Sequence, residues 1–153
     1  MRKIWFFFLL VFLNYGCEPD DVCSEANPSN PQLVFRLYNS SQPNEFKAVD
    51  TLRIMSLGDQ APLEFINTDS IVVPLQVNAS KINTDLTISD GVTDRIEIDY
   101  LTKDVYLSRA CGFQSTFQIE SIAVDQPSSW INSIEIVTNE VIIDTLAHVK
   151  IYH

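Results

Sequence analysis

Asp94-Arg95-Ile96-Glu97-Ile98-Asp99-Tyr100 is the stretch that decides the fold, because charged and apolar residues alternate along it. Successive side chains of a β-strand point to opposite faces, so a period of two predicts a strand with one buried face. We expect Ile96, Ile98 and Tyr100 to face a core and the charged side chains to face water. The stretch therefore predicts a half-buried strand.

The same alternation recurs on both sides of this strand, in segments divided by turn signals. The predicted strands contain Leu33, Phe35 and Leu37; Leu52 and Ile54; Val105 and Leu107; Phe117 and Ile119; Ile134 and Ile136; and a run from 141 to 151. The predicted turns are residues 59–62, 89–91, 102–104, 126–128 and 138–140. Pro74 follows an apolar run and cannot donate to a ladder, so that strand should lie at an edge or break there.

Strands at intervals of about ten residues, with no long helical period between them, predict an all-β fold. We expect an antiparallel β-sandwich or barrel-like domain of about 7–9 strands.

The N-terminus carries a secretory signal pattern. Met1-Arg2-Lys3 is followed by ten consecutive apolar residues, 4–13. A membrane-spanning helix needs roughly 20 such residues, so a permanent transmembrane anchor is not expected. Residues 1–16 are therefore predicted to be a signal peptide that is removed.

Leu13-Asn14-Tyr15-Gly16-Cys17 resembles the lipobox of bacterial lipoproteins, in which the cysteine is acylated and becomes the new N-terminus. Gly16 is the small residue expected before the cysteine, whereas Asn14 and Tyr15 depart from the usual residues. The resemblance implies lipid attachment, with a chain such as palmitate, at Cys17 and membrane contact through that lipid. The alternative is an ordinary signal peptide that leaves Cys17 as a plain thiol.

The chain has three cysteines, and an odd number in an exported protein needs an explanation. If Cys17 carries lipid, Cys23 and Cys111 remain as a pair. In an oxidising envelope compartment these two are expected to form a disulfide. The alternative makes Cys111 a nucleophile, which would need a partner such as His148 or His153.

Removal of residues 1–16 leaves 137 residues, the length of one ordinary domain. Residues 18–31 hold three prolines and four acidic residues, which favours a tether over a core. We expect an acidic, Pro-rich tether over 17–31 and a single β-sandwich domain over 32–153. The acids beside Cys17 resemble the surface-transfer signal of Bacteroidota lipoproteins, and a solvated linker accounts for them equally well.

Charge excludes one class of partner. The net charge is −10 and becomes −12 without Arg2 and Lys3, so the surface repels phosphate backbones and nucleic acid is not an expected partner. We predict that His148 lies on a solvated strand face, that residues 90–94 form a hairpin turn and not a calcium loop, and that Trp130 is a core residue. The sequence predicts no metal site, no cofactor and no catalytic residue.

Four segments, residues 17–23, 69–75, 108–112 and 147–153, together resemble DUF6452, a domain-of-unknown-function family of small lipoproteins from Flavobacteriia and other Bacteroidota. The resemblance implies an envelope location and a Cys23–Cys111 pair. It implies no activity.

These patterns predict a lipid-anchored outer-membrane lipoprotein, on the periplasmic or cell-surface side. Its β-domain is expected to be a non-enzymatic binding or scaffolding module for an envelope protein. The alternative is a glycan-active enzyme or ligand carrier that uses acids such as Asp99. A deep pocket with convergent carboxylates would favour that alternative, and a filled core would count against it.

Overall fold

The computed structural model describes Cys23, residues 29–56 and residues 58–153. Its described residues form eleven strands and no helix: β1 (Leu33–Asn39), β2 (Gln42–Phe46), β3 (Val49–Ser56), β4 (Leu63–Thr68), β5 (Ser70–Val73), β6 (Lys81–Ile88), β7 (Thr93–Ser108), β8 (Gly112–Val124), β9 (Ser133–Ile136), β10 (Glu140–Val141) and β11 (Val149–Tyr152). The all-β prediction is confirmed. The described strands outnumber the expected 7–9 because β5, β9, β10 and β11 have four residues or fewer.

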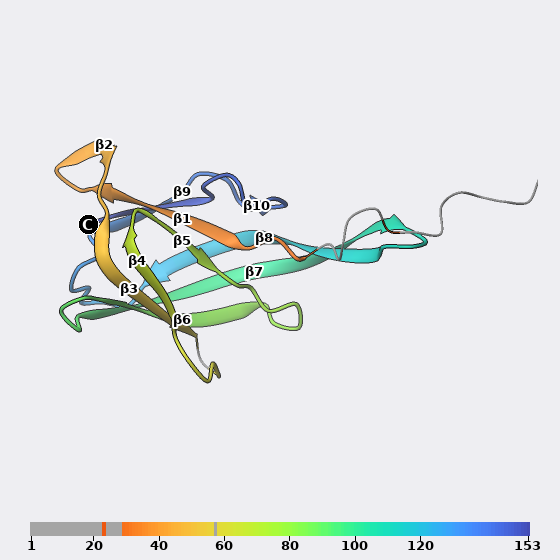
Figure 1. The fold of residues 1–153 in the computed structure, drawn as a ribbon, viewed down its shortest axis with the longest axis horizontal. Helices are drawn as coiled ribbons and strands as arrows, with labels where there is room; N and C mark the ends of the chain where they lie inside the picture. The colour runs from red at the N-terminus through yellow and green to blue at the C-terminus, as the bar shows by residue number, and fades with distance from the viewer. Residues whose placement is uncertain (1–22, 24–28, 57) are drawn as a thin grey trace, which may run out of the picture. The chain divides into compact units, whose positions relative to one another are not determined.

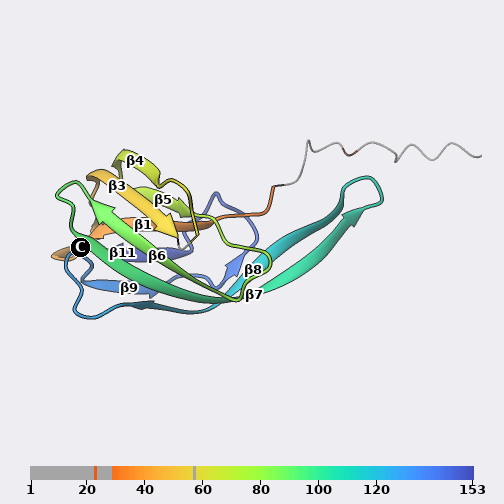
Figure 2. The same cartoon turned by 90° about the horizontal axis from the view of Figure 1, so that it is seen from below.

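The described strands divide into two sheets. In the five-stranded sheet, β1 pairs antiparallel with β2 and β5, and β9 pairs antiparallel with β11. The β1–β11 pair is parallel, with Phe35 opposite Val149 and Leu37 opposite Ile151. β1, β11 and β9 lie side by side in Figure 2. The sequence predicted an antiparallel sandwich, and this pair differs. β1 and β11 are the first and last of the described strands, and the residues between them supply the long connection that a parallel pair needs.

The six-stranded sheet has the order β10-β8-β7-β6-β3-β4 and curls into a half-barrel (Figure 1). Its inner face and the five-stranded sheet share one apolar core. The core residues are Leu33, Phe35, Leu37, Val49, Leu52, Ile54, Ile71, Val73, Ile82, Leu86, Ile96, Ile98, Tyr100, Phe117, Ile119, Trp130, Ile131, Val141, Val149 and Ile151. Fully burying one large apolar side chain contributes about 1.5–3 kcal/mol, so this cluster is the main source of stability.

The apolar residues of the 94–100 stretch were expected to face a core, and they do. Ile96, Ile98 and Tyr100 are fully buried in β7. The Tyr100 hydroxyl donates to the Gln76 carbonyl at 2.8 Å and accepts from the Gln76 N–H at 3.0 Å. These two hydrogen bonds give the buried hydroxyl a partner as donor and as acceptor, as buried polar groups require. The apolar half of the prediction is therefore confirmed.

Two predictions about strand ends are tested nearby. β5 pairs with β1 and ends at Val73, directly before Pro74, which confirms the predicted break at this proline. Residues 102–104 were predicted to be a turn and instead lie within β7, which continues to Ser108. The chain reverses at residues 109–111. Gly112, directly after this turn, has a positive φ of 72°, which glycine adopts without steric cost.

Period-two alternation fails in the second half of β7. Val105 and Leu107 were expected to be buried, yet they are 40% and 39% exposed. Every residue from Lys103 to Leu107 is exposed, so both faces of the strand meet solvent there. Alternation shows which residues share a face, but it does not show whether another layer covers that face.

The predicted strand from 141 to 151 is two strands with an irregular connection. β10 ends at Val141, β11 begins at Val149, and residues 142–148 are neither helix nor strand. Ile142, Ile143 and Leu146 are more than half exposed in this connection. The apolar alternation here overstated the strand length.

The described residues form two compact units. We call residues 29–105 and 114–153 the β-domain and residues 106–113, with Cys23, the hairpin tip. β7 and β8 contribute residues to both units.

Candidate functional site

The hairpin tip is built on a disulfide between Cys23 and Cys111, whose Cα atoms lie 5.0 Å apart. The Cys111 N–H donates to the Ser108 hydroxyl at 3.0 Å, which closes the turn between β7 and β8. The predicted pairing is confirmed, and Cys111 in this bond is not a free thiol nucleophile. Cys17, the predicted lipid attachment residue, lies outside the described residues.

The disulfide ring is accompanied by exposed apolar side chains. Tyr106 is 54% exposed and Phe113 is 69% exposed, and their rings meet edge to face with centroids 5.3 Å apart. Leu107 is also exposed. These three residues were not predicted as a group, because the 105/107 alternation was interpreted as a buried strand face. The adjacent pair Tyr106-Leu107 was the available signal, since both faces of one strand are apolar there.

Asp94 begins the 94–100 stretch. It was expected to face water, yet it is only 3% exposed. Its carboxylate accepts from the backbone N–H groups of Ser129 at 2.6 Å and of Trp130 and Ile131 at 2.8 Å. Burial acts to raise the pKa of this carboxyl, but the three N–H donors outweigh burial and hold the pKa below its usual value. Asp94 shares the parity of Ile96, so it points inward with it.

The Asp94 hydrogen bonds hold the segment that brings Trp130 into the core. The Trp130 indole N–H donates to the Leu86 carbonyl at 3.1 Å, and the side chain is 9% exposed. The prediction that Trp130 is a core residue is confirmed. The carboxylate therefore organises structure and does not sit in a cleft where it would meet a substrate.

His148 was predicted to lie on a solvated face, and this prediction is wrong: the residue is 1% exposed. Its ring Nδ1 accepts from the Val34 backbone N–H at 3.0 Å, and the backbone N–H of His148 donates to the Val34 carbonyl at 2.9 Å. Burial lowers the pKa of the ring, although a backbone hydrogen bond at Ile143 and the charge of Asp144 oppose this. The error came from extending strand parity through an irregular connection.

His153 is the second imidazole, and its ring packs edge to face on Trp130 with centroids 5.6 Å apart. Its Nε2 lies 3.0 Å from the Lys47 carbonyl, and burial lowers the pKa of the ring. Neither histidine can activate Cys111 as a thiol nucleophile in this state, because Cys111 is bonded to Cys23. In the part of the chain that the structure describes, no three His, Cys, Asp or Glu side chains gather to hold a metal ion.

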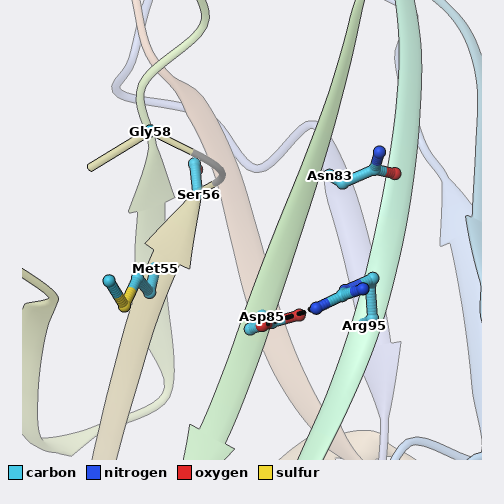
Figure 3. Close-up of a pocket in the computed structure, with 6 residues that line it drawn as sticks. All are labelled: Met55, Ser56, Gly58, Asn83, Asp85 and Arg95. Carbon is cyan, nitrogen blue, oxygen red and sulfur yellow. Dashed lines mark hydrogen bonds and ion pairs between the residues drawn. The ribbon is translucent and has the colours of Figure 1, made fainter.

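A shallow depression of about 190 Å³ lies on the outer face of β3, β6 and β7 (Figure 3). It is lined by Met55, Ser56, Gly58, Asn83, Asp85 and Arg95. Arg95 donates to both carboxylate oxygens of Asp85, at 2.6 and 2.9 Å, and these bonds hold the pKa of Asp85 below its usual value. A depression this small, with its charges already paired, falls short of the roughly 300 Å³ at which ligand pockets begin.

Asp99, the acid named for the glycan alternative, also has partners. It accepts from the Ser121 hydroxyl at 2.8 Å and lies 3.2 Å from the Lys81 ammonium, and these contacts lower its pKa. A glycosidase needs a pair of carboxylates across a cleft, one of them with a raised pKa. The lowered pKa of Asp99 does not suit the general-acid role.

A family model described as "Family of unknown function (DUF6452)" matches residues 51–153. No curated protein and no solved structure matches the chain. Among the described residues there is no helix that could cross a bilayer.

Proposed function

The chain belongs to the DUF6452 family, whose function is unknown, and from that premise we propose that it is a lipid-anchored envelope protein whose β-domain binds a protein partner. The lipid would be attached to Cys17 and would hold the protein at the outer membrane, on the periplasmic or cell-surface side. No catalytic step is part of this proposal.

The observation that carries the proposal is the Cys23–Cys111 disulfide. Disulfides persist in oxidising compartments such as the bacterial envelope and are rare where thiols are kept reduced. The bond also accounts for two of the three cysteines, so Cys17 is the one that remains. Cys17 stands directly after a cationic and then apolar segment, which is where a lipoprotein cysteine would stand.

Metabolic labelling with an alkynyl fatty acid tests the anchor. We expect label on the wild-type chain, loss of label in Cys17→Ala and retention of label in Cys23→Ser. The third variant is the matched control, because it removes a cysteine six residues further along the chain. An unlabelled wild-type chain, or a labelled Cys17→Ala chain, would contradict the anchor.

The binding role is supported by the outer strand β4. It stands at the end of the six-stranded order and pairs with β3. Ile66 is 74% exposed and Leu63 is 42% exposed on this strand. An edge strand offers backbone hydrogen bonds, and exposed apolar side chains beside it offer selectivity to an added strand. β4 is longer than β5, the strand that ends before Pro74. Half of the residues of β5 are buried.

Site-specific photo-cross-linking in cells tests the docking strand. A photoreactive residue in place of Ile66 should give a discrete protein adduct, and adding Leu63→Asp should remove it. The same residue in place of Leu146, which is 61% exposed and lies outside any strand, is the control and should give no such adduct. Absence of an adduct at position 66, or equal adducts at both positions, would contradict docking at β4.

A further inference from the structure

Three apolar side chains of the hairpin tip are exposed without belonging to the core. Tyr106 and Phe113 form an edge-to-face pair, and Leu107, the residue after Tyr106, is also exposed. Tyrosine is enriched at membrane–water interfaces, and phenylalanine and leucine supply the apolar side of segments that lie in the interface. The tip therefore has the composition of an interfacial contact.

The charge of the hairpin tip contrasts with that of the whole chain. The chain has a formal net charge of −10, yet residues 106–113 contain no Asp or Glu and one basic residue, Arg109. Carboxylates are repelled by anionic headgroups and are costly to bring into the interface. Residues 106–113 therefore bring no carboxylate of their own to a lipid surface, whereas the tether joined to them through Cys23 carries four acidic residues.

The disulfide fixes how far this segment can be from the proposed lipid. Cys23 stands six positions after Cys17, so the fully extended chain between them spans roughly 20 Å at about 3.3–3.6 Å per residue. Cys23 then lies 5.0 Å, Cα to Cα, from Cys111 in the tip. Such a short tether holds the tip at a local concentration in roughly the millimolar range beside the bilayer, where a weak contact is enough.

We propose that the hairpin tip is a second membrane contact, in which Tyr106, Leu107 and Phe113 enter the headgroup region of the bilayer that holds the lipid at Cys17. This inference rests on the proposed lipid anchor for its geometry. The tip contact would fix how the protein stands on the membrane, which a single lipid attachment at Cys17 alone does not do.

A tryptophan reporter tests the contact. Phe113→Trp, in the full lipidated chain on vesicles of phosphatidylethanolamine and phosphatidylglycerol, should show blue-shifted emission that acyl-chain-brominated lipids quench. Trp130 is buried and gives a constant background. Ile66→Trp, at a 74% exposed position on β4, is the matched control and should keep aqueous emission. Adding Leu107→Asp to Phe113→Trp should return its emission to the aqueous wavelength.

A second preparation separates failure of the tip from failure of the anchor. The chain from Glu18 onward, with an N-terminal oligohistidine tag, is bound to the same vesicles through a nickel-chelating lipid. Quenching of the Phe113→Trp reporter in this preparation supports the tip contact even where Cys17 proves unacylated. Aqueous emission at position 113 in both preparations overturns the proposal and leaves the tip to a protein partner. Equal quenching at positions 113 and 66 also overturns it, since the contact would then not be specific to the tip.

Discussion

The β-domain and the hairpin tip are built from the same two strands, but their apolar side chains meet different surroundings. Ile98 and Tyr100 of β7 are fully buried, whereas Tyr106 and Leu107 of the same strand are exposed. The β-domain has one continuous apolar cluster, and the tip has a covalent bond between Cys23 and Cys111. Eight consecutive residues are too few for a core, so a disulfide replaces burial there.

This difference separates the residues that maintain the fold from those available for function. Substitution of a buried side chain changes stability first, so its functional effect is hard to isolate. Substitution of an exposed tip residue should leave the fold intact and change only what the tip contacts. Substitutions in the two regions test this separation.

Two phenylalanines give the sharpest comparison. Phe35→Ala in β1 empties a fully buried position and should lower the free energy of unfolding by about 3–5 kcal/mol. Phe113→Ala in the tip removes a ring that is 69% exposed and should change it by no more than about 0.5 kcal/mol. Urea unfolding followed by Trp130 fluorescence measures both. Similar losses in the two variants would show that the tip is part of the folding core.

The disulfide is next in size. Replacing Cys23 and Cys111 together by serine releases a closure of 88 residues, which should lower the free energy of unfolding by about 2–4 kcal/mol through the unfolded chain. Amide exchange should become fast at residues 106–113 and remain slow at Ile98 and Phe117, which are buried. Loss of protection throughout β7 and β8 would contradict the view that the bond acts on the tip alone in the folded state.

Much of the fold follows from sequence because the outward and inward faces of the strands differ in polarity. Ile96, Ile98 and Tyr100 were assigned to a core and are buried, and Cys23 with Cys111 was assigned as a pair and is bonded. The cysteine pair could be inferred because its chemistry depends on compartment and number and not on local conformation. Trp130 was also assigned correctly, from the apolar residues around it.

The errors share a physical cause, which is that strand parity holds only within one strand. His148 was given a solvated face by counting through residues 142–148, which do not form a strand. Asp94 was assigned outward because it is charged, although its parity with Ile96 pointed inward. Its burial depends on N–H donors 35 to 37 residues away, a long-range contact that no local pattern contains.

Asp94 gives the third prediction. Asp94→Asn keeps the shape but removes the charge that three N–H groups bind, so the free energy of unfolding at pH 7 should fall by about 1–3 kcal/mol. Because folding lowers the pKa of this carboxyl, its contribution is complete above the unfolded pKa, near 3.9, and is lost as pH falls through the folded pKa. The variant should therefore lose less stability than the wild type on acidification in that range.

Asp99→Asn is the matched control for this carboxylate. Asp99 lies on the same strand but is partly exposed, and its partners are side chains of Ser121 and Lys81. Its substitution should have the smaller effect at pH 7, as urea unfolding of both variants would measure. Equal effects would mean that the buried N–H contacts of Asp94 contribute no more than a surface ion pair.

The smallest expected effect is the pH dependence of stability that His148 causes. It should appear in the β-domain and not in the hairpin tip. Burial lowers the pKa of its ring, so below the unfolded value, near 6.5, the unfolded chain binds a proton that the folded chain excludes. Stability should therefore be complete above that pH and fall as pH drops through it toward the folded pKa. Protonation would also take away the Nδ1 acceptor from the Val34 N–H.

His148→Gln should flatten this pH dependence in thermal melts between pH 5 and 7.5. His153 has a pKa lowered in the same direction, so His153→Gln is the control that measures its separate share. Residues 106–113 of the tip contain no histidine, aspartate or glutamate. The emission of a Phe113→Trp reporter should therefore stay constant while the β-domain loses stability. A wild-type melting temperature that does not change with pH, or an emission that follows the His148 titration, would contradict the independence of the two regions.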